Sequence, residues 1–160
     1  MCGTTAFFYS DELLRYQFGP DHPYQPIRFQ LIRDTLREMD VFDDRLVYVE
    51  SPSATEDDLR EVHEESLINY VKELSRIGSG YLDMGDTPVC QGLFEGALAA
   101  VGATLHGAEC IARGEYDHVM TPGGGLHHAR RDKSAGFSVF NDLAVAVRRL
   151  QRKYGYERVA

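Results

Sequence analysis

A long stretch of small residues, from residue 91 to residue 113, most strongly limits what this chain can fold into. Its alanines and glycines are closely spaced, and they include Ala97, Ala99, Ala100, Gly102, Ala103, Gly107 and Ala108. Side chains this small let a helix backbone approach a neighbouring element closely. The stretch therefore predicts a long helix that is buried against a sheet or another helix.

Short apolar runs alternate with helical patterns along the rest of the chain. The expected strands are brief apolar runs, and they cover residues 4–9, 46–49 and 118–121. The expected helices cover residues 26–39, 56–61, 65–77 and 142–153, and the first, third and last of them have apolar residues on one face. Thr55 with Asp58 indicates a capping box before the second of these helices, and Asn141 or Asp142 can cap the last. This alternation predicts βαβ units, that is, an α/β fold with a mostly parallel sheet and flanking helices.

The first expected helix follows a polar segment, residues 11–24, whose glycine and prolines predict a loop. Pro26 suits the first position of that helix. The helix has apolar residues on one face, and they are Ile27, Leu31, Ile32 and Leu36. A one-sided pattern of this kind is typical of an amphipathic helix.

The composition indicates one soluble globular domain. The chain has 160 residues, of which 43% are apolar and 26% charged, and this length allows a hydrophobic core. A net charge of −8 argues against a nucleic-acid-binding surface and mildly favours cationic partners. Three scattered cysteines make no disulfide framework. With no signal peptide and no apolar run near twenty residues, we expect a cytoplasmic protein that does not enter membranes.

Two adjacent histidines, His127 and His128, follow a run of glycines just after the third expected strand. A parallel α/β sheet presents its chemistry at the carboxyl ends of its strands, and glycines there let backbone approach a ligand. Imidazole is well suited to moving a proton near neutral pH. The pair is therefore a candidate for proton transfer. On the pair alone, a turn without function is an alternative.

Three segments carry a family resemblance. Residues 124–142 (GGLHHARRDKSAGFSVFND) look like the active-site segment of the histone deacetylase superfamily, especially of its bacterial acetoin utilisation and acetylpolyamine amidohydrolase branch. Residues 19–28 resemble the family's amino-terminal HPxxPxR segment, and residues 85–89 its substrate-binding loop. The likeness runs in order from about residue 8 to residue 159. It implies a three-layer arginase/deacetylase-like fold.

The resemblance implies roles for the histidine pair and for one arginine. In the family, one of two such histidines is the general base on a zinc-bound water and the other donates a proton to the leaving amine, which makes His127 and His128 the expected catalytic residues. Arg28 matches an arginine near an internal cavity behind the metal. A surface salt bridge is the alternative for Arg28. The other four histidines, His22, His63, His106 and His118, are interpreted as structural.

The resemblance also implies a substrate channel. Asp86 matches a carboxylate that holds the backbone amide of an acyl-lysine substrate, although an aspartate in such a loop can simply cap a turn. Phe137 resembles the aromatic wall of the narrow channel, with a plain core phenylalanine as the alternative. Gly125 and Gly136 are expected to line the same channel, because a β-carbon there would narrow it.

The zinc ligands that the resemblance implies have no counterpart here. In the family they are an Asp-x-His pair and a more distant aspartate, and residues 156–160 look like the opening of the strand that leads to the pair. We therefore expect residues 1–160 to form the amino-terminal portion of a deacetylase-like domain, truncated to about three strands. Zn²⁺ is the cofactor expected of a complete family member, and the isolated chain is predicted to be inactive.

Two functions of different kinds remain open, besides the chain being a fragment of a longer protein. The first is a zinc-dependent deacetylase, a hydrolase that removes acyl groups from acyl-lysine or an acylpolyamine. The second is a non-catalytic, truncated module that self-associates or binds a partner. Because the third strand would offer a bare edge, we expect a homo-oligomer formed through that edge.

Overall fold

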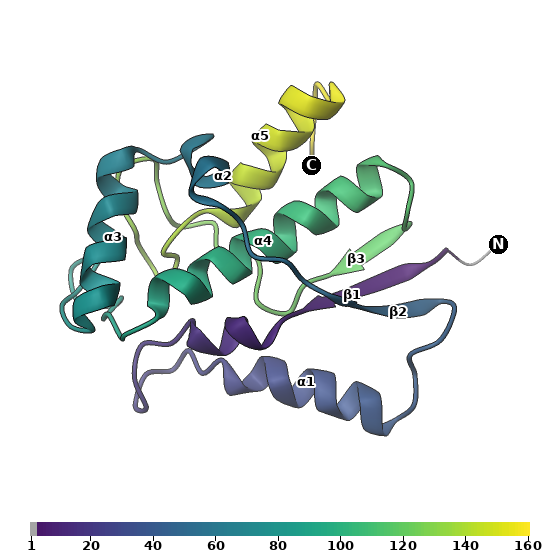
Figure 1. Ribbon diagram of the computed structural model, residues 1–160, viewed down its shortest axis with the longest axis horizontal. Helices are drawn as coiled ribbons and strands as arrows, with labels where there is room; N and C mark the ends of the chain where they lie inside the picture. The colour runs from purple at the N-terminus through teal and green to yellow at the C-terminus, as the bar shows by residue number, and fades with distance from the viewer. Residues whose placement is uncertain (1–2) are drawn as a thin grey trace.

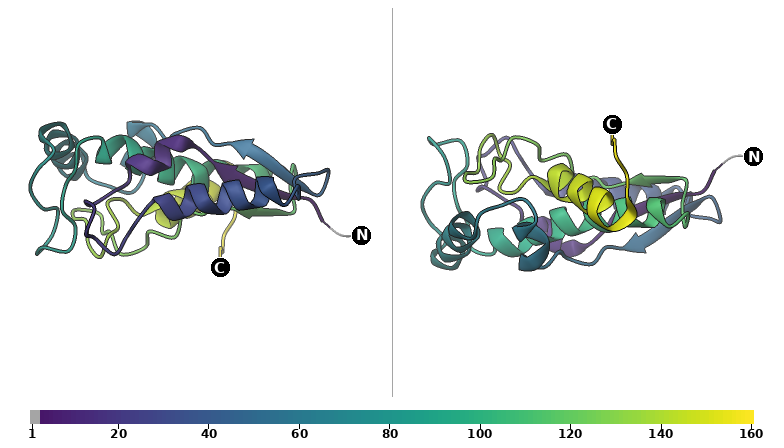
Figure 2. Two further views of the ribbon diagram at one scale, coloured as in Figure 1. Left: turned by 90° about the horizontal axis from the view of Figure 1, so that it is seen from below. Right: turned by 90° about the horizontal axis from the view of Figure 1, so that it is seen from above.

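The computed structural model describes residues 3–160. Its sheet has three parallel strands, which are β1 (Thr5–Tyr9), β2 (Leu46–Glu50) and β3 (His118–Met120), in the spatial order β2-β1-β3. Helix α1 (Ile27–Glu38) lies on one side of the sheet, and α4 (Leu93–Ala112) with α5 (Asp142–Tyr154) lies on the other (Figures 1 and 2). The expected three-layer α/β fold with a parallel sheet is confirmed.

The central strand β1 carries the middle of the core, because a strand flanks it on each side and helices cover both faces. Ala6 and Phe8 pack in one apolar cluster with Ala103 and Cys110 of α4. Phe7 points to the opposite face, where its ring lies near those of Tyr9, Phe42 and Tyr48. This alternation along β1 is that of a strand buried on both faces.

Helix α4 is buried along its length, as its small residues predict. A β-carbon on Gly96 would collide with the backbone of Tyr16, and one on Gly102 would collide with the carbonyl oxygen of Pro52. On Gly107 it would lie 2.6 Å from a side-chain carbon of Val119 in β3. The segments that supply these neighbours therefore rest directly on the helix backbone.

The remaining helices are short or amphipathic, and they are the 3₁₀ helix η1 (Asp11–Arg15), α2 (Glu56–Arg60) and α3 (Glu65–Ile77). The capping box expected of Thr55 and Asp58 is formed. Asn141 caps α5, and its side chain accepts a hydrogen bond from the backbone N–H of Ala144. The expectation of a loop throughout residues 11–24 is wrong at η1, where the Ser10 side chain accepts from Glu12 and starts a helical turn.

The apolar face of α1 lies differently from what its pattern suggests. Ile27 and Leu31 have exposed fractions of 48% and 58%. The buried positions are instead Phe29 and Arg33. The guanidinium of Arg33 lies 4.6 Å from the ring centroid of Tyr9, where its planar group packs on the sheet. Residue 26 is the N-cap of the helix rather than its first residue.

The edge strand β3 and the carboxyl-terminal residues 156–160 are not paired with each other as β-strands. Within residues 3–160, β3 pairs with β1 alone. Residues 156–160, which resemble the opening of a strand, form no strand here and lie beside the apolar residues Ala108, Ile111 and Leu150 of α4 and α5. A strand requires a neighbour with which to pair, and these two helices offer none. No helix in the described residues has the length and apolar character to cross a bilayer.

Candidate active site

The glycine turn after β3 places the two candidate histidines side by side at the surface. The ring centroids of His127 and His128 are 4.4 Å apart, and both side chains are exposed, whereas Leu126 and Ala129 on either side are buried. The Nδ1 atom of His127 lies 2.9 Å from the carbonyl oxygen of Gly125. A carbonyl only accepts, so Nδ1 carries the proton and Nε2 of a neutral ring keeps its lone pair. His127 therefore has a free basic nitrogen.

Gly136 and Phe137 belong to the turn that lies beside the second histidine. Gly136 has φ +54°, and a β-carbon on it would lie 3.1 Å from Cγ of the His128 ring. Phe137 has φ +67°, a left-handed conformation that non-glycine residues rarely adopt. The hydroxyl of Tyr16 donates to the Phe137 carbonyl over 2.6 Å and accepts from the backbone N–H of Val139 over 2.8 Å. These bonds hold the strained backbone in place.

The carboxylate of Asp83 organises the loop that carries Asp86. Its Oδ1 atom accepts from the backbone nitrogens of Gly85, Asp86 and Thr87 at 3.1, 2.9 and 2.8 Å, and its Oδ2 accepts from the Thr87 hydroxyl at 2.5 Å. Burial acts to raise the pKa of Asp83, but these hydrogen bonds outweigh it and hold the pKa below its usual range. The Asp86 side chain is left exposed.

His22 joins the three resembling segments. Its Nε2 donates to the carbonyl oxygen of Asp86 over 3.1 Å, and its Nδ1 accepts from the backbone N–H of Tyr24 over 3.0 Å. Its ring meets the ring of Phe137 edge-on, with centroids 4.6 Å apart, and the ring of Phe18 at 4.8 Å. The amino-terminal segment, the Asp86 loop and the Phe137 ring are thus in contact.

Most of the sequence-predicted residues come together here. His127, His128 and Gly136 form one group, and Phe137 connects it to the Asp86 loop through the bond from its backbone nitrogen to the Thr87 hydroxyl, 3.3 Å. Gly125 adopts φ +89° in the turn before the histidines, with no atom within 4 Å of the place of a β-carbon. The structure therefore brings these predicted residues into one region of the surface.

Arg28 stands apart from this group. It is exposed at the start of α1, with its guanidinium 5.3 Å from the ring centroid of Tyr24 and 5.7 Å from that of Phe29. Its role beside an internal cavity stays a prediction.

Sequence reasoning missed Tyr16 and His22 as parts of the site. Tyr16 is fully buried, and burial raises its pKa well above the usual value, so its hydroxyl stays protonated as a hydrogen-bond donor. Nothing in the local pattern separates it from a core tyrosine. His22 lies in the amino-terminal motif, residues 19–28, and this position in the motif is the sequence signal that could have identified it as part of the site.

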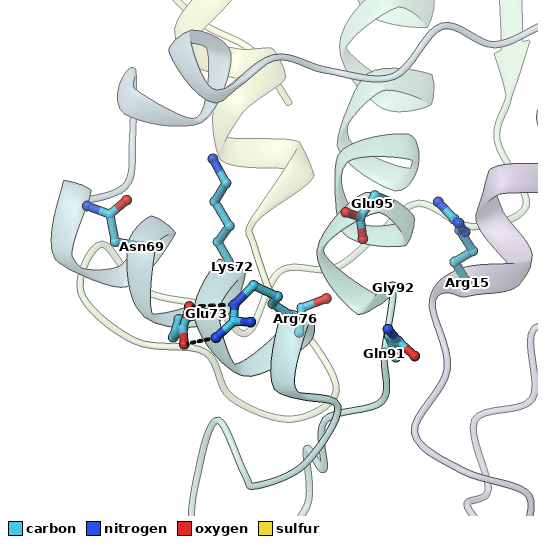
Figure 3. Close-up of a pocket in the computed structure, with 9 residues that line it drawn as sticks. Arg15, Asn69, Lys72, Glu73, Arg76, Gln91, Gly92 and Glu95 are labelled. Carbon is cyan, nitrogen blue, oxygen red and sulfur yellow. Dashed lines mark hydrogen bonds and ion pairs between the residues drawn. The ribbon is translucent and has the colours of Figure 1, made fainter.

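A cleft of about 930 Å³ lies elsewhere on the molecule, between α3, η1 and the start of α4 (Figure 3). Its lining includes Arg15, Lys72 and Glu95, together with Arg76, which is paired with Glu73 at 2.8 Å. The candidate catalytic and substrate-binding residues are not among its lining residues. Volume alone therefore does not mark the site predicted from the sequence.

Within residues 3–160, no group of three or more histidine, cysteine, aspartate or glutamate side chains is arranged to hold a metal ion. A protein zinc site requires at least three such ligands. The described residues therefore do not fit a zinc site by themselves.

The fold and the converging loops define an α/β protein whose candidate site lies at the carboxyl ends of parallel strands. This chain belongs to the histone deacetylase family, because its residues 22–160 match the family model described as the histone deacetylase domain.

Full-length relatives agree with this assignment. The chain is 36% identical over 157 residues to the acetoin utilization protein AcuC of Bacillus subtilis, covering 94% of this chain and 40% of that protein. It is 32% identical to a probable deacetylase of Archaeoglobus fulgidus, covering 98% of this chain and 43% of that one. Histone deacetylase RPD3 of Saccharomyces cerevisiae is 28% identical, at 92% and 36% coverage. The chain thus spans about two fifths of the length of these relatives.

A solved structure shares the fold. The crystal structure of the HDA15 HD domain superposes with a TM-score of 0.78 at 25% sequence identity. The match covers 90% of this chain and 42% of that one. The arginase/deacetylase-like fold implied by the sequence resemblance is therefore confirmed for this portion.

Proposed function

We propose that residues 1–160 form the amino-terminal portion of a deacetylase domain and supply its proton-transferring and acyl-binding residues. The observation that carries this proposal is the contact chain from the His127–His128 pair through Gly136 and Phe137 to the Asp86 loop. The relatives include a probable deacetylase and a histone deacetylase. The proposed substrates are acylated lysine or an acylated polyamine in the cytoplasm.

The two imidazoles divide the proton transfers of amide hydrolysis. His127, with its free Nε2, takes a proton from the attacking water, and His128 gives a proton to the nitrogen of the departing amine. Both protons move at the protein surface beside the channel wall, where the two rings are 4.4 Å apart. A hydroxide equivalent then forms the new bond to the acyl carbon, and the bond from that carbon to the amine nitrogen breaks.

The substrate is held by the loops around the pair. The aliphatic stem of an acyl-lysine packs along the phenyl face of Phe137, and Gly125 and Gly136 leave room for the acyl group. The exposed carboxylate of Asp86 accepts a hydrogen bond from a substrate amide N–H. The net charge of −8 favours approach of a cationic amine carrier.

Zn²⁺ is proposed as the cofactor of a complete family member, with ligands outside these residues. Because the described residues do not fit a zinc site, the chain alone should release no acetate from an acetyl-lysine peptide in added zinc. Turnover well above that of His127→Ala would contradict this expectation.

The catalytic part of the proposal needs a chimera. Residues 1–160 are joined to the portion of the Bacillus subtilis relative that this chain does not match. We expect this chimera to release acetate, and His127→Ala within it to lower the rate at least about a hundredfold. If the chimera is active and His127→Ala does not lower its rate of acetate release, the proposed role of His127 is wrong. Parallel assays with an acetylated polyamine rank the two substrate classes.

A second candidate function rests on the edge of β3. The outer backbone groups of this strand pair with no strand of the described residues, and Met120 is 47% exposed. Such an edge is a template for pairing with a second copy. A module of this kind would self-associate without catalysis. Light scattering at rising concentration tests it: a dimer is expected, and a strict monomer excludes association through this edge.

A further inference from the structure

The Asn141 side chain, at the start of α5, makes hydrogen bonds to the backbone around the histidine pair. The amide nitrogen Nδ2 of Asn141 donates to the carbonyl oxygens of His127 and Ala129, each over 3.1 Å. These two carbonyls lie immediately before and after His128. The same side chain uses its oxygen to accept from the backbone N–H of Ala144, 2.9 Å, and so caps the helix.

The next residue, Asp142, anchors the turn that precedes the histidines. Its side chain is fully buried, and its oxygens accept from the backbone nitrogens of Gly125 and Leu126 at 2.9 and 2.7 Å. The hydroxyl of Thr104 in α4 donates to the same carboxylate over 2.5 Å. A β-carbon on Gly124 would lie 3.0 Å from this carboxylate and 2.6 Å from the Thr104 hydroxyl. The turn is therefore fixed to the buried helix.

A third contact closes the far side of the loop. His63 is 4% exposed, and its Nε2 accepts from the backbone N–H of Asn141 over 3.0 Å. Its Nδ1 lies 2.9 Å from the carbonyl oxygen of Arg130, to which it must donate. One neutral ring thus joins the N-cap of α5 to the residue two positions after His128.

We infer that Asn141 is the positioning residue that sets the geometry of the two imidazoles, with Asp142 and His63 holding it and the turn in place. The catalytic task of the imidazoles rests on the proposed function. The contacts by which Asn141 holds their backbone do not depend on it.

The chemistry of the residue at position 141 supports this inference. A helix cap alone needs one acceptor, which serine, threonine or aspartate supplies as well as asparagine. The loop needs in addition two donors at the end of a short side chain, and among the good capping residues the asparagine amide alone provides both. The identity of residue 141 is therefore explained by the histidine loop and not by the helix.

The decisive variant is Asn141→Asp in the 160-residue chain. Aspartate keeps the size and the capping oxygen but places a carboxylate against two carbonyl oxygens. The matched control is Asn69→Asp, which makes the same change at the chain's other asparagine, an exposed residue of α3. The measurements are NMR spectra of the histidine rings and amide hydrogen exchange.

The Leu126 amide donates to Asp142 Oδ1 and the His128 amide donates to the Ser138 hydroxyl. In Asn141→Asp the loop around these bonds should open more often, so exchange at both amides should be about tenfold faster. The ring signals of His127 and His128 should shift, while the amides of α5 from Val145 onward keep the protection seen in the control. Ring signals and exchange rates that match those of Asn69→Asp would overturn the inference.

Asn141→Ser covers the case in which the new charge unfolds the chain. Serine also caps the helix but cannot reach both carbonyls, so the same loosening of the loop is expected. A folded Asn141→Ser chain with an unaltered histidine loop again overturns the positioning role. Loosening of the loop in both variants, or in Asn141→Ser where Asn141→Asp does not fold, supports that role. This result would hold even if the chimera described above proves inactive, so failure of the proposed function is a separate outcome.

Discussion

The buried hydroxyl of Thr87 lies 3.3 Å from the backbone nitrogen of Phe137 and donates to the carboxylate of Asp83. Residues 50 positions apart in the chain are thereby linked. The bond connects the loop that exposes Asp86 to the Gly136–Phe137 turn beside His128. The Asp86 loop and the histidine segment are consequently held together by a direct hydrogen bond.

Thr87→Val should separate these two loops without changing the volume at position 87. Loss of the hydroxyl leaves a carboxylate and an amide short of a partner, so the free energy of unfolding should fall by about 1–3 kcal/mol. Thr35→Val, at an exposed position of α1, should change it by less than about 0.5 kcal/mol. Urea denaturation measures both changes. Equal values would show that the Thr87 hydroxyl does not stabilise the contact between the two loops.

Gly136→Ala should displace the ring of His128. The left-handed backbone at this position, φ +54°, costs an alanine about 1 kcal/mol, and the new methyl would lie 3.1 Å from the ring. Gly155→Ala, at φ +73° in open space, carries the same backbone cost without the contact. Both variants should lose similar stability, but His128 ring signals should move only in Gly136→Ala. Unmoved signals there would contradict the close packing.

Acidification should weaken the loop through His63. Burial lowers the pKa of this ring in the folded state, so the unfolded chain binds the proton more readily. Stability from the neutral ring is therefore complete above about pH 6.5 and declines as the pH falls below that value. Denaturation at about pH 7.5 and about pH 5.5 should show a larger loss in the native chain than in His63→Gln.

His106 supplies the background for that comparison. Burial also lowers its pKa, so it contributes a loss of the same sign that remains in His63→Gln. If the free energy of unfolding depends on pH equally in the native and His63→Gln chains, His63 binds protons equally well in the folded and unfolded states. That result would contradict this prediction.

Local signals predicted most of the secondary structure. The helix from Glu65 to Ile77 has the expected ends, because Gly78 takes the left-handed conformation that stops it. The buried face of α1 was not predictable from its apolar stripe, since the side chain that packs on Tyr9 is that of a charged residue, Arg33. A long arginine can cover a ring with its guanidinium while ion pairs satisfy its charge.

The candidate site likewise contains residues that the sequence predicts and residues that it does not. The histidine pair and the Asp86 loop stand out in the sequence because each lies in a compact motif. The partners that hold them do not, because Tyr16 and Phe137 are 121 positions apart and His63 and Asn141 are 78 apart. Only the tertiary fold brings such residues together, and no local period or spacing encodes these contacts.

The most direct test of the proposed substrate site is binding of an acetyl-lysine peptide to the isotope-labelled 160-residue chain, followed by NMR. We expect signal changes at Asp86, Gly136, Phe137 and the histidine rings. These changes should be absent with the unacetylated peptide and weaker in Asp86→Asn. Changes confined to the charged cleft of Figure 3, or equal changes with the unacetylated peptide, would contradict this expectation.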